Sequence, residues 1–273
     1  MQQISEFIIT KEYKRFTEFC NACKQEKYIG LCYGPAGVGK SMAAYNFARW
    51  HDVIREFEIK AKIQSWMDYP GPTINVAELD TILYTPEVCN TPRSVDADIT
   101  DLIYKFNILI EKGIFKNQEI PFEERVKCRV NLLIIDEAER LQPKSLELVR
   151  DIYDRKQIAV ILIGMPGIEK RLIRFPQLYS RIGFSHMYKP LIEQEVTFII
   201  QNHMQSLGIA FYPKDFSDQE AIATVTRVTQ GNFRLIQRLL KQASRIMVVN
   251  KLSSITKEVI EAARECLVIG NLY

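Results

Sequence analysis

The segment Gly34-Pro35-Ala36-Gly37-Val38-Gly39-Lys40-Ser41 matches the phosphate-binding pattern G-x-x-x-x-G-K-[ST] at every fixed position. An apolar run from Tyr28 to Tyr33 precedes it and predicts a strand, while residues Lys40 to His51 predict a helix. This order suits phosphate binding, because a helix begins with free backbone N–H groups. We therefore interpret the segment as a nucleotide-binding loop and not as a simple glycine-rich turn.

Each part of this loop has a chemical role. The glycines let consecutive backbone N–H groups point inward around the phosphates. Lys40 contacts the β and γ oxygens, and the Ser41 hydroxyl coordinates Mg²⁺. The predicted nucleotide-binding residues are Gly34, Pro35, Ala36, Gly37, Val38, Gly39, Lys40, Ser41 and Met42.

A second segment supplies carboxylates. Residues Asn131 to Ile135 form an apolar run that ends in Asp136 and Glu137, and a buried parallel strand presents acids at its C-terminal edge in this way. Ligands bind at that edge in open α/β sheets. We predict that Asp136 holds Mg²⁺ and that Glu137 polarises the attacking water as general base. The alternative is an acidic first turn of a helix.

The composition limits the possible classes of protein. The chain has 273 residues, with 36 basic and 33 acidic side chains and a net charge of +3. This length allows one α/β domain and a small companion. Because the charge is nearly balanced, nucleic-acid binding would depend on local clusters of cations. No apolar run is long enough to span a membrane and Met1 to Thr10 lacks a leader pattern, so we expect a cytoplasmic protein with no membrane partner.

The six cysteines are scattered and indicate reduced thiols instead of a disulfide framework. Cys20 and Cys23 form a C-x-x-C pair, but no second pair or histidine follows closely enough to complete a zinc site. We interpret the pair as small residues on one face of a helix.

Strand and helix patterns alternate along the first two thirds of the chain. Thr10 is predicted to cap a helix at residues 11–25. Further strands are predicted at 79–84, 131–135, 158–163 and 182–188, and further helices at 95–112 (opened by Ser94), 143–155 and 168–175, with an irregular stretch at 51–78. This alternation implies a parallel sheet covered by helices on both faces.

After Pro190 the strand signals end, and four helical stretches are predicted up to Tyr273. The predicted division is therefore an N-terminal helix at residues 1–27, an α/β nucleotide-binding core at 28–189 and a small all-helical lid at 190–273.

Phosphoryl transfer also needs cations for the charge that develops on the γ-phosphate. Arg181 lies at the junction between a short helix and the last strand, where it could face a neighbouring subunit. Arg234 lies in Gly231-Asn232-Phe233-Arg234, at the start of a lid helix. We interpret both as functional because of their placement relative to the two nucleotide motifs, the alternative being ordinary surface charges.

Together these features resemble an AAA+ ATPase. The segment from Gly34 resembles the Walker A loop, Leu132 to Glu137 the Walker B strand, Arg181 the arginine finger and Gly231 to Arg234 the second sensor. The segment Ile134 to Leu141, followed by a helix and then by Ile161 to Gly167, is similar to the TnsC/TniB group of transposition regulators, relatives of MuB and IstB.

This resemblance implies an ATP- and Mg²⁺-dependent ATPase that assembles on double-stranded target DNA as a hexameric ring or helical filament. Such proteins link a target-selection protein to the transposase, and ATP hydrolysis controls their disassembly. The trans-acting arginine comes from the adjacent subunit, so Arg181 would act only in an oligomer and isolated chains would hydrolyse ATP poorly.

One position departs from the family pattern. AAA+ proteins usually carry a polar first-sensor residue at the end of the fourth strand, where this chain has Gly164-Met165. A thioether cannot orient an attacking water as an amide or hydroxyl does. The sensing role therefore lies elsewhere, or hydrolysis is slow.

The resemblance also places DNA contacts after the second strand. The cations in this region are Arg93, Lys105, Lys112 and Lys116. Arg93 is the best single candidate because it precedes the helix that Ser94 opens, whose N-terminus adds backbone donors for a phosphate; the alternative is a solvated loop arginine.

The lid carries a separate basic stripe. Between Ala221 and Lys257 there is no acidic residue, and cations recur at helical spacing at Arg234, Arg238, Lys241 and Arg245. We expect Arg234 to face ATP and the other three to meet water or a neighbouring subunit in preference to DNA.

Three other classes of function share parts of this pattern. An AAA+ initiator or helicase loader not tied to transposition has the same core but usually adds a duplex-reading domain. A signalling NTPase normally carries sensor repeats beyond the lid. A protein that binds ATP only to assemble would fit the methionine at position 165.

Overall fold

A computed structural model describes residues 7–116, 118, 123 and 127–267 of the chain. The chain divides into two compact units. The α/β unit contains Arg15–Gly34 and Lys40–Met187, and the helical unit contains Met1–Lys14, Pro35–Gly39 and Tyr188–Tyr273. The three-part division predicted from the sequence, with boundaries after residues 27 and 189, remains our proposal. In the described part of the chain, no helix combines the length and the apolar character that crossing a membrane requires.

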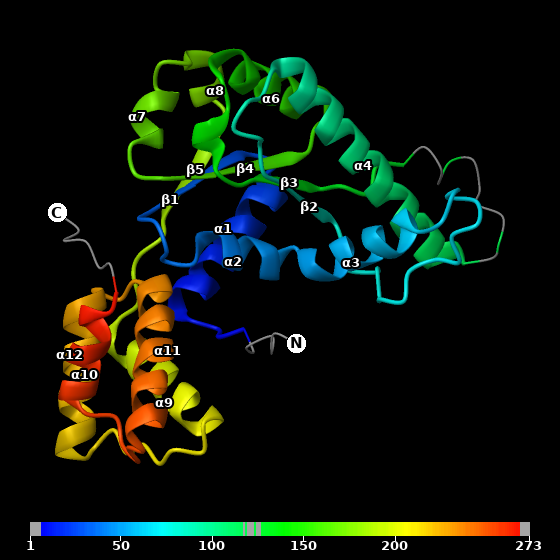
Figure 1. The fold of residues 1–273 in the computed structure, drawn as a ribbon. Coiled ribbons are helices and arrows are strands. Elements are labelled where there is room, and N and C mark those ends of the chain that lie inside the picture. Colours follow the sequence, from blue (N-terminus) through cyan, green and yellow to red (C-terminus); the bar gives the residue numbers. More distant parts are fainter. Residues whose placement is uncertain (1–6, 117, 119–122, 124–126, 268–273) are drawn as a thin grey trace. The chain divides into compact units, whose positions relative to one another are not determined.

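The α/β unit is built on a parallel sheet, which confirms the predicted fold class (Figure 1). In the described residues the sheet has five strands in the order β2-β3-β4-β1-β5. The strands are β1 (Ile29–Tyr33), β2 (Thr81–Tyr84), β3 (Leu132–Ile135), β4 (Ala159–Gly164) and β5 (Ile182–Met187), and every neighbouring pair is parallel.

The predicted apolar runs became the inner strands. All residues of β3 and β4 are buried, because helices cover both faces of the sheet. β5 lies at an edge and is half-buried to exposed. The register pairs Tyr33 with Gly164 and Ile135 with Leu162, so β1, β3 and β4 end at the same edge.

Helices flank this sheet, and further helices follow β5 up to Glu265 (Figure 1). The helices up to β5 are α1 (Lys11–Glu26), α2 (Lys40–Phe47), α3 (Trp50–Ala61), α4 (Pro92–Phe115), the 3-10 turn η1 (Ala138–Arg140), α6 (Pro143–Lys156), α7 (Ile168–Leu172) and α8 (Pro176–Tyr179).

The helical unit confirms the four helices predicted after Pro190. They are α9 (Glu193–Ser206), α10 (Phe216–Thr229), α11 (Phe233–Asn250) and α12 (Lys257–Glu265). Their apolar faces form one core that includes Val196, Ile200, Val225, Leu239 and Ile260, each fully buried or nearly so. The apolar stripes at helical spacing therefore face one another, as the periodicity indicates.

The single helix predicted from Lys40 to His51 is wrong. The chain ends α2 at Phe47, adopts a left-handed conformation at Arg49 (φ 48°) and starts α3 at Trp50. The Arg49 side chain stabilises this junction by donating to Asp52 at 3.1 Å and to the Asn75 carbonyl oxygen at 3.2 Å. The stretch predicted to be irregular therefore begins with a helix, and only its later part is loop.

Two helix boundaries also differ from prediction. Thr91, not Ser94, caps α4: the Thr91 hydroxyl accepts from the Ser94 N–H at 3.1 Å, and the Ser94 hydroxyl accepts from the Thr91 N–H at 2.9 Å. Arg93 therefore lies inside the first turn and not before the helix. The helix predicted at 168–175 ends earlier, as α7 at Leu172, and a separate short helix, α8, starts at Pro176, a position that needs no N–H donor.

Candidate active site

The loop from Gly34 to Ser41 joins β1 to α2, as the sequence predicts. Gly37 and Gly39 have φ values of 80° and 112°, conformations that side chains with a Cβ rarely adopt. The Gly34 N–H donates to the Gly164 carbonyl oxygen at 3.4 Å, which fastens the start of the loop to the end of β4. Residues Lys40 and Ser41 open α2, so the free N–H groups of its first turn point toward the loop.

The Lys40 ammonium group lies at the C-terminal edge of the sheet. Its Nζ donates to the Gly34 carbonyl oxygen at 2.6 Å and to the Met165 sulfur at 3.9 Å. Met165, the residue at the first-sensor position, therefore reaches the phosphate-binding lysine. Its thioether accepts a weak hydrogen bond but has no proton to donate.

Asp136 is buried directly after β3, with 5% of its surface exposed. Its N–H donates to the Tyr84 carbonyl oxygen at 2.9 Å, and its Oδ1 accepts from the Glu137 N–H at 2.9 Å. Burial and the charge of Asp136 together raise the pKa of Tyr45.

These residues fit Mg²⁺ held together with phosphates. Among the described residues, no group of three or more His, Cys, Asp or Glu side chains could hold a metal by itself. A magnesium site in a phosphoryl-transfer enzyme needs fewer protein ligands, because phosphate oxygens and water complete the octahedron. The Ser41 hydroxyl and the Asp136 carboxylate are hard oxygen donors of the required kind.

Glu137 is held in an unusual backbone conformation by its surroundings. It has φ 51°, and its carboxylate is ion-paired with Arg140, three residues further along. The same arginine donates to the Pro86 carbonyl oxygen at 3.1 Å, and Asn90 donates to the Arg140 carbonyl oxygen at 2.9 Å. The predicted general base is therefore tied to the loop after β2, through Arg140 and Asn90, two residues that the sequence analysis missed.

The second-sensor segment contacts the phosphate-binding loop within the helical unit, to which Pro35–Gly39 belong. The Asn232 side-chain amide donates to the Ala36 carbonyl oxygen at 2.7 Å, and the Arg234 N–H donates to the Gly37 carbonyl oxygen at 3.0 Å. A Cβ at Gly37 would lie 2.6 Å from the Asn232 side-chain oxygen, so only glycine fits there. The sequence analysis missed Asn232, although it stood inside the quoted motif.

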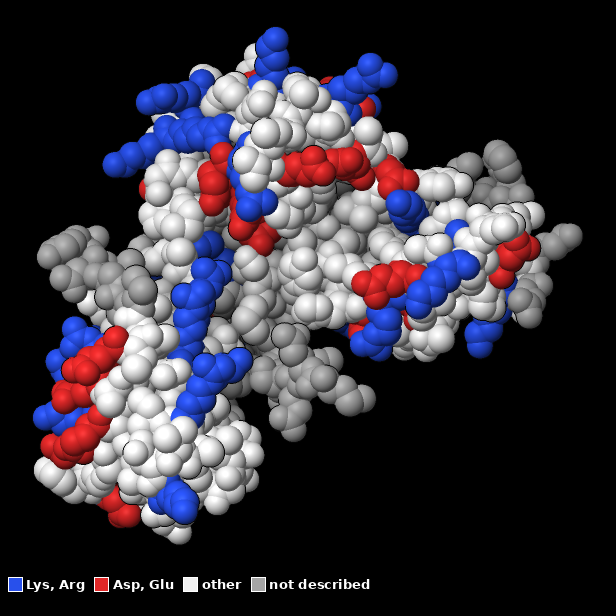
Figure 2. All heavy atoms as spheres, in the orientation of Figure 1, with Lys and Arg blue, Asp and Glu red and all other residues white. Residues whose placement is uncertain are grey.

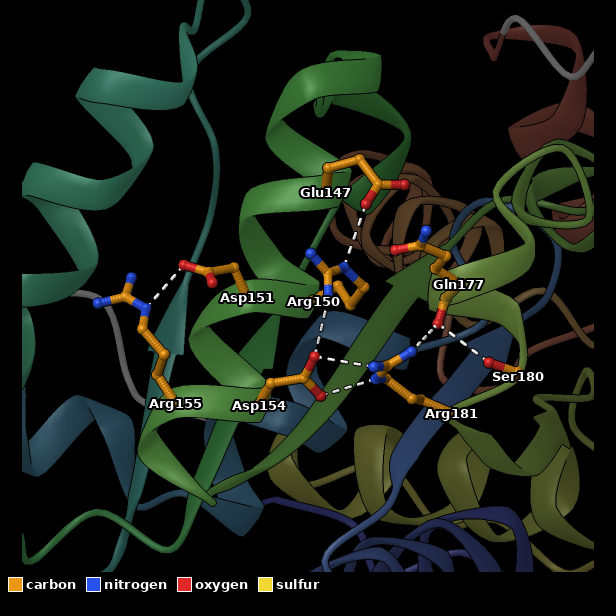
Figure 3. A network of polar contacts seen from close by, with 8 residues as sticks. All are labelled: Glu147, Arg150, Asp151, Asp154, Arg155, Gln177, Ser180 and Arg181. Carbon is orange, nitrogen blue, oxygen red and sulfur yellow. Dashed lines mark hydrogen bonds and ion pairs between the residues drawn. The ribbon is translucent and has the colours of Figure 1, made fainter.

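Arg181 is fixed by contacts inside its own chain (Figure 3). Its Nε and Nη2 donate to the two carboxylate oxygens of Asp154 on α6, at 2.7 and 2.9 Å, and its Nη1 donates to the Gln177 carbonyl oxygen. Asp154 also accepts from Arg150 at 2.9 Å, and Arg150 bonds Glu147 at 3.1 Å. The hydrogen bonds from Arg181 lower the pKa of the Asp154 carboxyl, with a smaller effect from Arg150.

The structure does not bring the four predicted DNA-binding residues together. Arg93 is exposed in the first turn of α4, whereas Lys112 and Lys116 lie at the other end of this 24-residue helix, about 30 Å away at 1.5 Å per residue. Lys105 is ion-paired with Asp101 at 2.6 Å, and Lys112 donates to the Met67 carbonyl oxygen at 3.4 Å. The four residues are therefore spread along α4, and their role in DNA binding stays a prediction, with Arg93 as the best single candidate.

The basic stripe of α11 is exposed as expected (Figure 2). Arg234, Arg238, Lys241 and Arg245 all lie on the solvent side, opposite the buried Ile236, Leu239, Leu240, Ala243 and Met247. Figure 2 also shows acidic side chains gathered over α12. The helix α11 thus presents positive charge along one exposed face.

The two cysteines predicted to lie on a helix face, Cys20 and Cys23, have no features of reactive thiols. Cys20 and Cys23 are fully buried on α1, and burial raises the pKa of both thiols, that of Cys23 to about 12. Protonated, buried thiols are poor nucleophiles and poor metal ligands. All six cysteines are free.

Comparison with known proteins matches this site to a family. The model of the family described as AAA domain matches residues 23–172, more than half of the chain and all of the segments around Lys40 and Asp136. The chain belongs to the AAA domain family. A relative from Staphylococcus aureus, named a potential ATP-binding protein, is 42% identical over 277 residues and covers 99% of both chains. Family membership supports the identification of the Gly34 loop as that of an ATP-binding ATPase.

Solved structures share the fold across nearly the entire chain. The Thermotoga maritima RuvB Holliday junction branch migration motor has a TM-score of 0.59 and 18% identity, over 99% of this chain and 73% of that one. The Aeropyrum pernix ORC2 protein, in its ADPNP–ADP complexes, has a TM-score of 0.55 and 14% identity, over 97% of this chain and 69% of that one. These similarities confirm an AAA+ fold.

Proposed function

We propose that this protein is an ATP-dependent DNA-binding regulator of transposition, which oligomerises on target DNA and hydrolyses ATP to control its disassembly. The observation that carries the ATPase part is the Lys40–Asp136–Glu137 arrangement at one edge of the sheet. The transposition part rests on the resemblance of the Ile134 to Gly167 region to the TnsC/TniB group. The ORC2 and RuvB folds suit a DNA-associated protein of either this or a related kind.

The chain's own residues have separate roles in this proposal. The loop N–H groups and Lys40 bind the phosphates, and Ser41 and Asp136 hold Mg²⁺, which would supply charge neutralisation at the β and γ oxygens. Glu137 takes the proton of the attacking water as it adds to the γ-phosphorus. Arg234 is proposed to contact the nucleotide because its segment resembles the second sensor, and its backbone N–H donates to Gly37 in the loop.

Arg181 completes the site of a neighbouring copy in this proposal. An arginine supplied in trans stabilises the charge on the transferring phosphoryl group and accelerates hydrolysis by about 10³- to 10⁵-fold. Hydrolysis should therefore be slow in separate chains and faster in a ring or filament on DNA. Met165, which cannot donate a hydrogen bond to water, also favours slow hydrolysis.

Double-stranded DNA, a transposase and a target-selection protein are the proposed partners. Arg93 in the first turn of α4 would contact a backbone phosphate, which gives binding independent of base sequence. A cytoplasmic location is part of the proposal and agrees with six free thiols. The alternative function is that of an AAA+ initiator or helicase loader unconnected to transposition.

Electron microscopy of the purified chain with duplex DNA and a non-hydrolysable ATP analogue tests the proposal. Rings or filaments that form only with both ligands would support it, as would an ATPase turnover per chain that rises with protein concentration. A chain that stays monomeric, or that binds no ATP, would refute it. Capture of a transposase by the DNA-bound assembly, but not by the free chain, would distinguish the transposition function from the initiator alternative.

A further inference from the structure

The structure assigns a positioning role to Asp154: this carboxylate on α6 orients Arg181 for contact with the nucleotide of the adjacent subunit. The inference rests on the proposed function, in which Arg181 acts in trans. Asp154 itself contacts no nucleotide in this scheme and acts through the arginine. Nothing in the sequence motifs pointed to it, because it lies 27 residues before its partner.

Asp154 binds Arg181 through two parallel hydrogen bonds (Figure 3). A guanidinium group has five N–H donors in one plane, and a carboxylate matches two of them along one edge. Asp154 takes one from Nε and one from Nη2, and the Gln177 carbonyl oxygen takes one from Nη1. The two remaining N–H groups, one on each Nη, lie at the outer end of the side chain. They are paired in the way that phosphate oxygens accept.

The charge balance leaves the arginine able to bind an anion. Asp154 also accepts from Arg150, so its negative charge is shared between two cations and does not neutralise Arg181 alone. Glu147 in turn bonds Arg150. The row therefore alternates in sign from Glu147 to Arg181 and ends in a cation, and Arg181 keeps its attraction for a phosphate.

Fixing the side chain favours catalysis in trans. A free arginine has many rotamers, and ordering them at the moment of reaction raises the barrier. With its plane already held by Asp154 on α6 and by the Gln177 carbonyl oxygen, Arg181 enters the neighbouring site as part of a rigid surface. Both side chains are partly buried. Arg181 and Asp154 each have 31% of their side-chain surface exposed.

A mixed-subunit ATPase assay tests this role. Chains with Arg181→Ala keep their own base but donate no finger, whereas chains with Glu137→Gln donate a finger but hydrolyse nothing. Mixing the two should restore turnover. Donor chains that carry both Glu137→Gln and Asp154→Asn should restore it at least about fivefold less, since a displaced catalytic group loses rate steeply. Asparagine keeps the shape of the side chain but turns a donor toward the guanidinium edge.

The matched control is Asp151→Asn in the same donor. Asp151 lies one turn earlier on α6 and pairs with Arg155 at 2.7 Å, so its loss tests the helix without touching Arg181. The inference predicts full rescue by this donor. It also predicts that Asp154→Asn placed in the Arg181→Ala chain has no effect on the rescue, because that chain has no finger to orient.

The outcomes separate the inference from the proposed function. Failure of the Glu137→Gln donor to rescue Arg181→Ala chains would refute Arg181 as a trans-acting group, and the inference with it. Rescue that is equal or higher with the Asp154→Asn donor would refute the positioning role alone. Equal losses with Asp151→Asn and Asp154→Asn would also refute it, since they would indicate a general effect on α6. Assembly on DNA, measured by sedimentation, should be the same for all donors.

Discussion

The Asn232 side chain joins the start of α11 to the phosphate-binding loop. Its oxygen accepts from the Leu235 N–H at 3.2 Å, which caps the helix, and its amide nitrogen donates to the Ala36 carbonyl oxygen at 2.7 Å. One side chain thus caps the start of a helix and holds the loop that we propose to bind ATP, although 196 residues separate it from Ala36. The position of Arg234 depends on the same contact.

Asn232→Ala should therefore weaken ATP binding as well as stability. Loss of the cap costs about 1 kcal/mol of unfolding free energy, and loss of the loop contact should raise the Kd for ATP about tenfold, equivalent to ~1.4 kcal/mol. Urea denaturation and titration with a fluorescent ATP analogue measure the two effects. The control is Thr256→Ala, which removes the equivalent cap of α12 without a loop contact. ATP binding that is equal in the two variants would contradict the proposed role of Asn232.

Lys40→Ala should abolish nucleotide-dependent DNA binding. The lysine donates to a loop carbonyl and reaches Met165, so its charge is concentrated where the phosphates are expected. Filter binding of labelled duplex DNA with and without ATP measures the effect, and circular dichroism checks that the variant folds. If Lys40→Ala chains bind DNA as well with ATP as the parent chain does, ATP is not the switch for DNA binding.

Glu137→Gln should trap ATP-bound assemblies, because the amide cannot accept a proton from the attacking water. Single-turnover hydrolysis should slow by at least about a hundredfold, while ATP binding is retained. Glu139→Gln is the control, since Glu139 is an exposed acid two residues away. Assemblies of the Glu137 variant that dissociate at the normal rate would remove this residue from the role of general base.

Arg140→Gln should raise the basal ATPase rate. The ion pair with Arg140 ties the Glu137 carboxylate to the loop after β2, and this restrains the movement of the base. We expect an increase of about two- to tenfold in turnover without DNA, with little change in the Kd for ATP. A lower rate would show that Arg140 orients Glu137 for catalysis instead of restraining it.

Arg93→Ala should weaken DNA binding and reduce its dependence on salt. One lost phosphate contact lowers the slope of log K against log salt by about 0.9. Lys105→Ala is a matched control on the same helix, because the charge of Lys105 is already paired with Asp101. Reversal of the exposed cations Arg238, Lys241 and Arg245 on α11 extends the test to the other basic face. A slope that changes only in the α11 variant would place the DNA there.

Glu56 should make stability depend on pH. Its carboxylate is fully buried and accepts from Tyr69 at 2.7 Å and from Thr73 at 2.9 and 2.5 Å. Burial raises its pKa, but the hydrogen bonds outweigh burial and the pKa is lowered. The stabilisation is therefore complete above the unfolded pKa of about 4.3 and is lost as the pH falls through the lower folded value.

Glu56→Gln should accordingly cost about 2 kcal/mol of unfolding free energy at pH 7, and less as the pH falls through the lowered folded pKa of Glu56, because protonation removes the charge. Urea unfolding at pH 7 and pH 3 measures the difference. Glu58→Gln, an exposed position on the same helix, should have no effect at either pH. A penalty for Glu56→Gln that does not change with pH would show that the charge of Glu56 is unimportant.

Most of the sheet could be predicted from the sequence. Strands such as Leu132–Ile135 are short apolar runs, and the helices of the helical unit have apolar residues at a period that only a helix satisfies. The misses occurred where local signals compete. Arg49 adopts a left-handed conformation that is rare for its residue type, and Thr91 and Ser94 cap each other, so either could have been the first residue of α4.

The candidate site was only partly predictable, because some of its contacts join distant parts of the chain. The loop, Asp136 and Glu137 follow from residues that are neighbours in the chain, because a strand, a tight turn and a helix N-terminus are local structures. The partners of these groups are distant: Pro86 lies 54 residues from Arg140, and Asp154 lies 27 from Arg181.

The amino-acid sequence by itself determined the alternation of strands and helices along the chain, the phosphate-binding loop and the acids at the end of β3. Each of these depends on periodicity or spacing within a few residues. Tertiary structure decided the contacts between groups that are distant in the chain. It fastened Arg181 to Asp154, tied Glu137 to the loop after β2 through Arg140, and separated Arg93 from Lys112 along α4. The physical reason is that an ion pair requires its two groups to meet within about 4 Å, and the folding of the whole sheet brings distant residues to that distance.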